Sequence, residues 1–288
     1  MAERTEWYRI MLNFVADMKG LFNEHSDQVT PEMLGFFADL ERMIISIADV
    51  MEVQSAVYPN IKAVVSPLAQ RGWFISAYLR QSQMLDLGQR CLHVPDAELD
   101  LHLLQMYRES VDDISQSLID DFPERAFAIR PATEAHKRGE YALSVPVFFA
   151  QAEGISFSTL NKYLFTDGKV KKGGISENIK TSANERLEEI QQFVGGTPFE
   201  VLGALHDALW RPFLETLPIA YGPKDRLDRK YFGLNRNTVM HGLALEEYAT
   251  EENSLKALSL LSSVASLAQA GGGGSWRDKN GELEPIQS

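Results

Sequence analysis

The sequence contains little cysteine and no long apolar run. Cys91 is the only cysteine in 288 residues, so neither an internal disulfide nor a CxxC metal motif can form. No stretch reaches the roughly 20 apolar residues that a membrane-spanning helix needs. The opening residues, MAERTEWYRI, lack the apolar core of a signal peptide. These absences predict a soluble cytoplasmic protein with no membrane partner.

Common catalytic and cofactor motifs are also absent. The chain has no HExxH, phosphate-loop or GxSxG pattern. Four histidines have no metal-ligand spacing: His25, His93, His102 and His206. The acidic pairs Asp112-Asp113 and Asp120-Asp121 favour a solvated helix face over a metal site. We therefore expect neither a metal nor a cofactor.

The chain has fewer basic than acidic residues, 28 against 40, and a net charge of −12. This balance argues against broad adhesion to nucleic acid, which depends on Lys and Arg displacing counterions. It does not exclude a small basic site that handles one RNA segment. The one basic stretch, 169–172, favours a solvated loop.

Helical periodicity dominates what is present. Apolar residues recur every three or four positions and strand alternation is missing, which predicts an all-α helical bundle. The expected helices cover 7–22, 30–51, 78–90, 96–121, 134–138, 141–158, 183–194, 234–246 and 251–269. Pro146 should kink its helix unless it lies in the first turn. Trp73 and Phe74 favour core burial beneath a loop over an exposed recognition surface.

Prolines suggest how the chain is divided. Phe122-Pro123 and Arg130-Pro131 are the expected breaks. They separate an N-terminal helical region, 1–121, with a regulatory or dimerising role, from a second helical bundle, 122–270. The final segment, 271–288, begins with GGGGS and predicts a flexible tail.

The most informative segment is Asn235-Arg-Asn-Thr-Val-Met-His241-Gly242. Arg236 and His241 resemble the R-x(4–6)-H signature of the HEPN superfamily, helical bundles that include many RNA-cleaving toxins and defence nucleases. Asn237 fills the position after the arginine where the family favours asparagine or aspartate. The helix beginning at Gly139 resembles the first HEPN helix, with Glu153 as its late acidic residue. This resemblance covers roughly 125–270. The chain as a whole resembles a bacterial family that carries such a C-terminal domain.

The same spacing occurs in Arg130 and His136. Pro131 should push Arg130 out of helical geometry, whereas Asn235 is a competent N-cap for a helix holding the other pair. In that helix Arg236 would lie in the first turn, where free N–H groups favour an anion. Asn237 could orient His241, four residues on. Arg236 and His241 would lie about 140° apart around the helix axis.

The resemblance implies a metal-independent endoribonuclease that acts as a homodimer in a toxin or antiphage system, with a possible regulatory protein partner. Histidine titrates near neutral pH and can transfer protons, and arginine offers a fixed fork of donors to phosphate. Two alternatives remain open. One is a non-catalytic HEPN-like module that binds partners or nucleotides. The other is a helical adaptor in which Arg236 and His241 are structural.

Overall fold

The computed structural model describes residues 13, 15, 16, 60, 61, 63–91, 93–160, 163–165, 209–228 and 233–270. Within these ranges the protein is helical and has no strand, which confirms the predicted all-α class. No helix there is long and apolar enough to cross a membrane. The helices expected over 7–22, 30–51 and 183–194 lie almost wholly outside the described residues. So do the basic stretch 169–172 and the tail 271–288.

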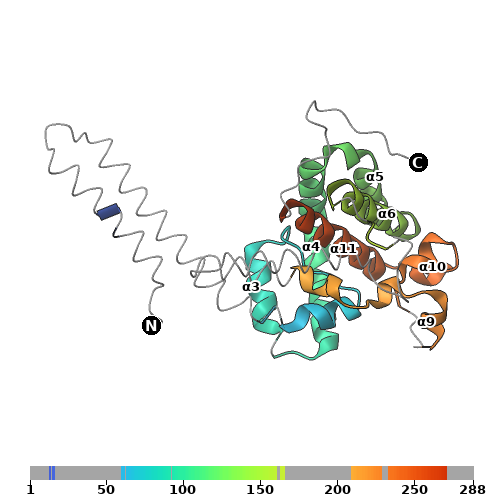
Figure 1. Cartoon of the computed structure of the whole chain (residues 1–288), viewed down its shortest axis with the longest axis horizontal. Coiled ribbons are helices and arrows are strands. Elements are labelled where there is room, and N and C mark those ends of the chain that lie inside the picture. The colour runs from blue at the N-terminus through green and yellow to red at the C-terminus, as the bar shows by residue number, and fades with distance from the viewer. Residues whose placement is uncertain are drawn as a thin grey trace.

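The labelled helices form a bundle around α11 (Figure 1). Their bounds are α3 (Gln81–Arg90), α4 (Asp96–Asp121), α5 (Ala126–Lys137), α6 (Tyr141–Leu160), α9 (Pro223–Asp228), α10 (Arg236–Met240) and α11 (Glu251–Ala270). Helix α11 packs mainly against α6 and also against α4, while α5 packs against both α4 and α6. Three of the predictions, for α4, α6 and α11, are confirmed to within about two residues, the usual uncertainty of helix ends.

Helix α11 is buried on almost every side. From 254 to 268 each residue except Lys256 is buried, because α4, α6 and the segment after Gly72 surround it. Its serines serve as hydrogen-bond partners inside this core. Ser259 Oγ accepts from the Phe74 N–H at 3.2 Å, and Ser266 Oγ accepts from the Ala77 N–H at 3.0 Å. The non-helical segment 73–77 can therefore be buried without leaving these N–H groups unpaired.

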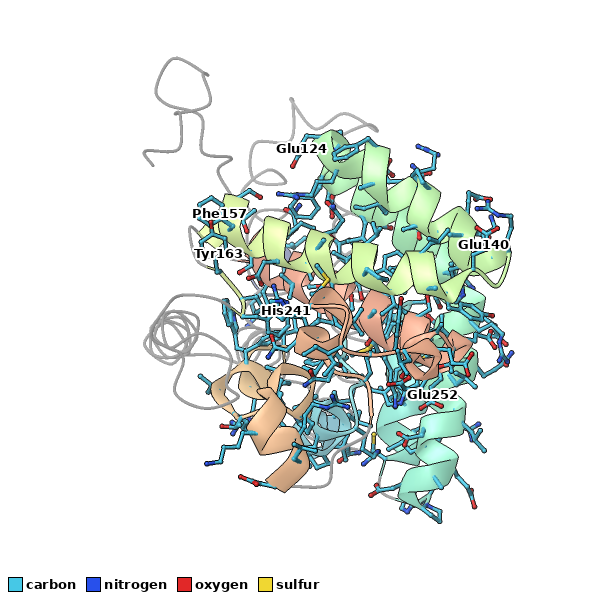
Figure 2. All side chains as sticks on the ribbon, turned by 90° about the vertical axis from the view of Figure 1, so that its right-hand side faces the viewer. Glu124, Glu140, Phe157, Tyr163, His241 and Glu252 are labelled. Carbon is cyan, nitrogen blue, oxygen red and sulfur yellow. The ribbon has the colours of Figure 1, made fainter. Side chains whose placement is uncertain are left out.

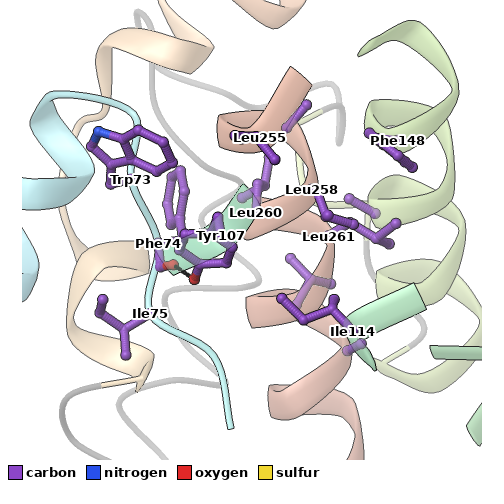
Figure 3. Packing of buried hydrophobic residues seen from close by; sticks show 14 of the residues in the cluster. Trp73, Phe74, Ile75, Tyr107, Ile114, Phe148, Leu255, Leu258, Leu260 and Leu261 are labelled. Carbon is purple, nitrogen blue, oxygen red and sulfur yellow. Dashed lines mark hydrogen bonds between the residues drawn. The ribbon is translucent and has the colours of Figure 1, made fainter. Parts of the chain in front are cut away.

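The aromatic residues of that segment lie in the core, as predicted (Figure 3). Trp73 and Phe74 are both fully buried. Trp73 stacks on Tyr107, with ring centroids 5.7 Å apart, and the Tyr107 hydroxyl donates to the Phe74 carbonyl. Gly72, at φ +88°, follows the helical residues 63–70 in a left-handed conformation that ends this helix and directs the chain inward. These contacts leave no exposed Trp-Phe recognition surface.

Helices α5 and α6 each contain a proline beyond their first residues. Pro146 lies beyond the first turn of α6, and the carbonyl it leaves free, that of Ala142, accepts a hydrogen bond from the Tyr248 hydroxyl at 3.3 Å. Pro131 lies inside α5, so the prediction that it ends helical geometry at Arg130 is wrong. Pro131 and the residue four before it, Phe127, are both exposed, so water can satisfy the unpaired carbonyl.

The helix around Pro131 is also longer than predicted, since α5 covers Ala126–Lys137 and the expected helix covered only 134–138. The break predicted at Phe122-Pro123 is a short 3-10 turn, Pro123–Arg125, between α4 and α5. A single hydrophobic core crosses this position. It contains Ile114 of α4, Phe148 of α6 and Leu258 of α11. The described residues on the two sides of 122 are therefore packed together.

Candidate functional site

Asn235 anchors the segment that carries the predicted motif. Its side-chain oxygen accepts from the Thr238 N–H at 3.0 Å, which confirms the predicted N-cap of α10. Its amide nitrogen donates to the carbonyls of Pro218 and Tyr221 at 2.9 and 3.0 Å. Asn235 is 1% exposed, and its amide oxygen and nitrogen are both hydrogen-bonded. The start of α10 is thus fixed to the turn that precedes α9.

Helix α10 is much shorter than predicted. It ends at Met240, so the expectation of one helix over 234–246 is wrong. Gly242, at φ +66°, occupies the left-handed position that closes a helix, and the Leu243 N–H returns to the Thr238 carbonyl at 2.8 Å. His241 is consequently the C-terminal cap of α10. Asn235 occupies one of the first-turn N–H groups, that of Thr238.

Asn237 holds Arg236 and the neighbouring turn. Its amide nitrogen donates to the carbonyls of Ala220 and Tyr221, both at 3.1 Å. Its amide oxygen accepts from Arg236 Nη1 at 3.2 Å. All of these contacts lead away from His241, so Asn237 positions the guanidinium and does not orient the imidazole as the sequence suggested.

The Arg236 guanidinium lies against an aromatic ring. Its Cζ atom is 5.5 Å from the centre of the Phe165 ring, a distance at which the cation and the ring attract each other. Arg236 is half-buried. Together with the Asn237 contact, this ring restricts the side chain on two sides while part of it stays open to solvent. Such a held, partly exposed arginine is suited to binding an anion.

Glu153 meets the same aromatic residue from α6. Its carboxylate oxygens accept from the Phe165 N–H at 3.1 and 3.4 Å. Helices α6 and α10 are also in contact. The structure therefore brings Glu153 and Arg236, which are far apart in sequence, to the same residue, Phe165. Glu153 fixes the backbone of Phe165, and the Phe165 ring supports Arg236.

His241, unlike the half-buried Arg236 and Asn237, has an exposed side chain. Figure 2 shows it at the end of α6 where Phe157 and Tyr163 lie. Three apolar side chains nearby in sequence are also exposed: Met240 by 37%, Leu243 by 59% and Leu245 by 76%. An accessible imidazole can exchange protons with a ligand or with water. The adjacent apolar side chains are available to a protein surface.

The second Arg–His match has a different environment. Arg130 is exposed on α5, but His136 is buried, with Nδ1 2.8 Å from Ser254 Oγ. Ser254 Oγ is in turn 2.7 Å from Ser144 Oγ. Burial lowers the pKa of His136, and nearby Glu251 opposes that effect. This histidine joins α5, α6 and α11 and has no access to a substrate.

The acidic face of α4 is occupied by hydrogen bonds and ion pairs. Asp112 pairs with Lys137 at 3.1 Å, and Asp121 accepts from the Tyr78 hydroxyl at 2.5 Å. Asp113 pairs with Arg80. Among the described residues, no group of three His, Cys, Asp or Glu side chains could hold a metal ion.

One residue of this site, Phe165, and two sets of contacts were not identified from the sequence. Phe165 supports Arg236 and contacts Glu153, yet an isolated Phe before a glycine-rich stretch gives no signal of either role. The buried hydrogen bonds of Asn235 and Asn237 to the 218–221 turn were also missed. The alternating asparagines on either side of Arg236 were the available signal. Comparisons of the chain with family profiles, curated proteins and solved structures found no match in any of the three.

Proposed function

We propose that the chain is a metal-independent endoribonuclease of HEPN type. The observation that carries the proposal is the pairing, on one short helix, of a held arginine with an exposed histidine. Arg236 is fixed by Asn237 and Phe165, and His241 caps the same helix with a free surface. By analogy alone, its setting is a bacterial toxin or antiphage system, with the N-terminal region regulating or dimerising the chain.

The proposed chemistry is transfer of a phosphoryl group within the RNA. The 2′-oxygen attacks the adjacent phosphorus and the bond to the 5′-oxygen breaks, giving a 2′,3′-cyclic phosphate and a free 5′-hydroxyl. One proton leaves the 2′-hydroxyl and one reaches the 5′-oxygen, and His241 serves one of these transfers. Arg236 stabilises negative charge on the non-bridging oxygens. Asn237 and Glu153 position the arginine, the latter through Phe165.

This chemistry predicts that cleavage does not depend on divalent metal. RNA cleavage by the purified chain should continue at the parent rate in excess EDTA, because only protein groups move protons and neutralise charge. The products should carry 2′,3′-cyclic phosphate ends, which can be detected by mass spectrometry. Loss of cleavage in EDTA with recovery on adding Mg²⁺ would reject the assignment, since it would require a metal-bound nucleophile or Lewis acid.

A second proton-transfer group has to come from elsewhere, and we propose that a second copy of the chain supplies it. The exposed residues Leu243 and Leu245 lie beside His241 and would be covered in such a dimer. Light scattering at micromolar concentration should give twice the 32.3 kDa chain mass. Replacing both leucines with Asp should produce a monomer and remove cleavage.

The matched control for the dimer is Leu101→Asp, which adds the same charge at an equally exposed leucine, 66% exposed, on α4. This variant should remain dimeric and active. A parent chain that is strictly monomeric with and without RNA contradicts the shared-site mechanism. A dimer that binds RNA or nucleotide tightly without cutting RNA instead supports the alternative, a non-catalytic HEPN-like binding module. The exposed apolar residues beside His241 are also consistent with that alternative.

A further inference from the structure

We infer that Tyr163, backed by Phe157, is a stacking platform for one unpaired nucleobase of the RNA beside the Arg236–His241 site. The inference rests on the proposed function and deepens it, because it assigns a base-binding residue and a substrate class. The class is single-stranded RNA, since a base inside a duplex is already stacked and cannot lie on a protein ring.

The two aromatic rings form a preorganised stack on the surface. Their centroids are 4.5 Å apart and their planes differ by 23°. Phe157 comes from the last turns of α6 and is half-buried, whereas Tyr163 follows the helix and is 43% exposed. Phe157 thus covers one face of the Tyr163 ring. The exposed part of Tyr163 is available to a flat ligand.

The position of Tyr163 is fixed by the residues that follow it. Leu164 is buried in the core at 1% exposure and anchors the turn. Phe165 is held through its N–H by the Glu153 carboxylate, and its ring contacts Arg236. Two residues of chain span at most about 7 Å, so Tyr163 lies next to the residue that supports the arginine. Figure 2 shows Phe157, Tyr163 and His241 at the same end of the molecule.

This juxtaposition matches what single-stranded RNA presents. Its phosphates need a cation, and its bases offer flat faces that stack on aromatic rings without regard to sequence. A phosphate bound at Arg236 would place a neighbouring base within reach of Tyr163. The platform would therefore hold the strand during cleavage and favour loops or unpaired segments over duplex.

The test measures RNA binding and cleavage with full-length variants. Binding uses the inactive His241→Ala chain and a fluorescent single-stranded RNA of about 12 nucleotides, within the site size of such proteins. Tyr163→Ala should raise the Kd about tenfold or more, as expected for loss of one stacked base. Tyr163→Phe should keep the parent Kd because the ring remains.

In the active chain, Tyr163→Ala should raise KM far more than it lowers kcat. Phe127→Ala, which removes a 79% exposed ring from α5, is the matched control and should change neither.

Abasic RNA adds a readout that a merely structural role would not move. Removing the stacked base from the RNA should raise the Kd of the His241→Ala chain about as much as the added Tyr163→Ala change does. It should cause no further rise in Kd when Tyr163 is already Ala. If the parent binds and cuts RNA and Tyr163→Ala has the same RNA affinity and KM, the stacking platform is rejected while the ribonuclease proposal is retained. A parent that neither binds nor cuts RNA overturns both. A Tyr163→Ala chain that loses its dimer but keeps its RNA affinity makes Tyr163 a protein contact, against the inference.

Discussion

His241→Ala should lower RNA cleavage by about 10²-fold or more, the range typical of losing an acid–base group. The imidazole is exposed at the end of α10, so its removal opens no buried cavity. The helix keeps its end, since the His241 N–H donates to the Asn237 carbonyl through the backbone. We therefore expect an unchanged melting temperature. Single-turnover cleavage of a labelled RNA, beside a thermal melt, measures both quantities.

Arg236→Ala should also lower cleavage, because it removes the charge that faces the phosphorane oxygens. The double variant should be little slower than the slower single variant, since both groups stabilise one transition state. Asn237→Ala should cost less, as it frees a guanidinium that Phe165 still supports. The proposed site therefore predicts a large loss of cleavage rate for the Arg236 and His241 variants and a smaller loss for the Asn237 variant.

Two other histidines provide controls. His93→Ala changes an exposed histidine in the turn between α3 and α4 and should leave both cleavage and stability unchanged. His136→Ala should keep the cleavage rate of the folded chain but lower the free energy of unfolding by about 1–3 kcal/mol, since it breaks a buried hydrogen bond to Ser254. A folded His241→Ala protein that cuts RNA at the parent rate would defeat the catalytic assignment.

The long helices were predictable because tertiary packing does not oppose their local sequence signals. In α4 the apolar residues recur at helical spacing, whereas α6 and α11 are apolar on most sides and occupy the core. The errors occurred where a local signal and a tertiary contact disagree. Pro131 should have ended a helix, but on the solvent face water can satisfy the carbonyl that it leaves unpaired. Pro146 is accommodated by the Tyr248 hydroxyl, a contact 106 residues away that no local pattern could indicate.

The site was predictable only in part. The spacing of Arg236 and His241, the cap at Asn235 and the presence of Glu153 all came from sequence. Gly242, at a positive φ, was the sequence signal that α10 ends at Met240. The role of Phe165 could not be predicted, because it depends on where the residues after α6 meet α10.

Trp73→Ala should lower the free energy of unfolding by about 3–5 kcal/mol, the cost of a large aromatic deletion from a core. Trp73 is fully buried, stacks on Tyr107 and lies under Lys256, whose Nζ is 5.3 Å from the centre of its ring. The cavity would open between α4, α11 and the 73–77 segment, where α11 serines already hold the backbone. Neighbouring side chains there have little freedom to collapse. Urea unfolding, monitored by circular dichroism, measures the change.

Trp73→Phe separates packing from polarity at this position. The indole N–H is buried and has no hydrogen-bond partner among the described residues, so replacing the ring system with phenyl removes that donor and leaves a smaller cavity than Ala does. We expect this variant to lie much closer to the parent than Trp73→Ala does. Phe127→Ala, at an exposed position on α5, should change stability by less than about 0.5 kcal/mol. A Trp73→Ala chain that keeps its stability but loses RNA binding would show instead that Trp73 reaches the ligand. The burial of its ring, and its stacking on Tyr107, argue against that outcome.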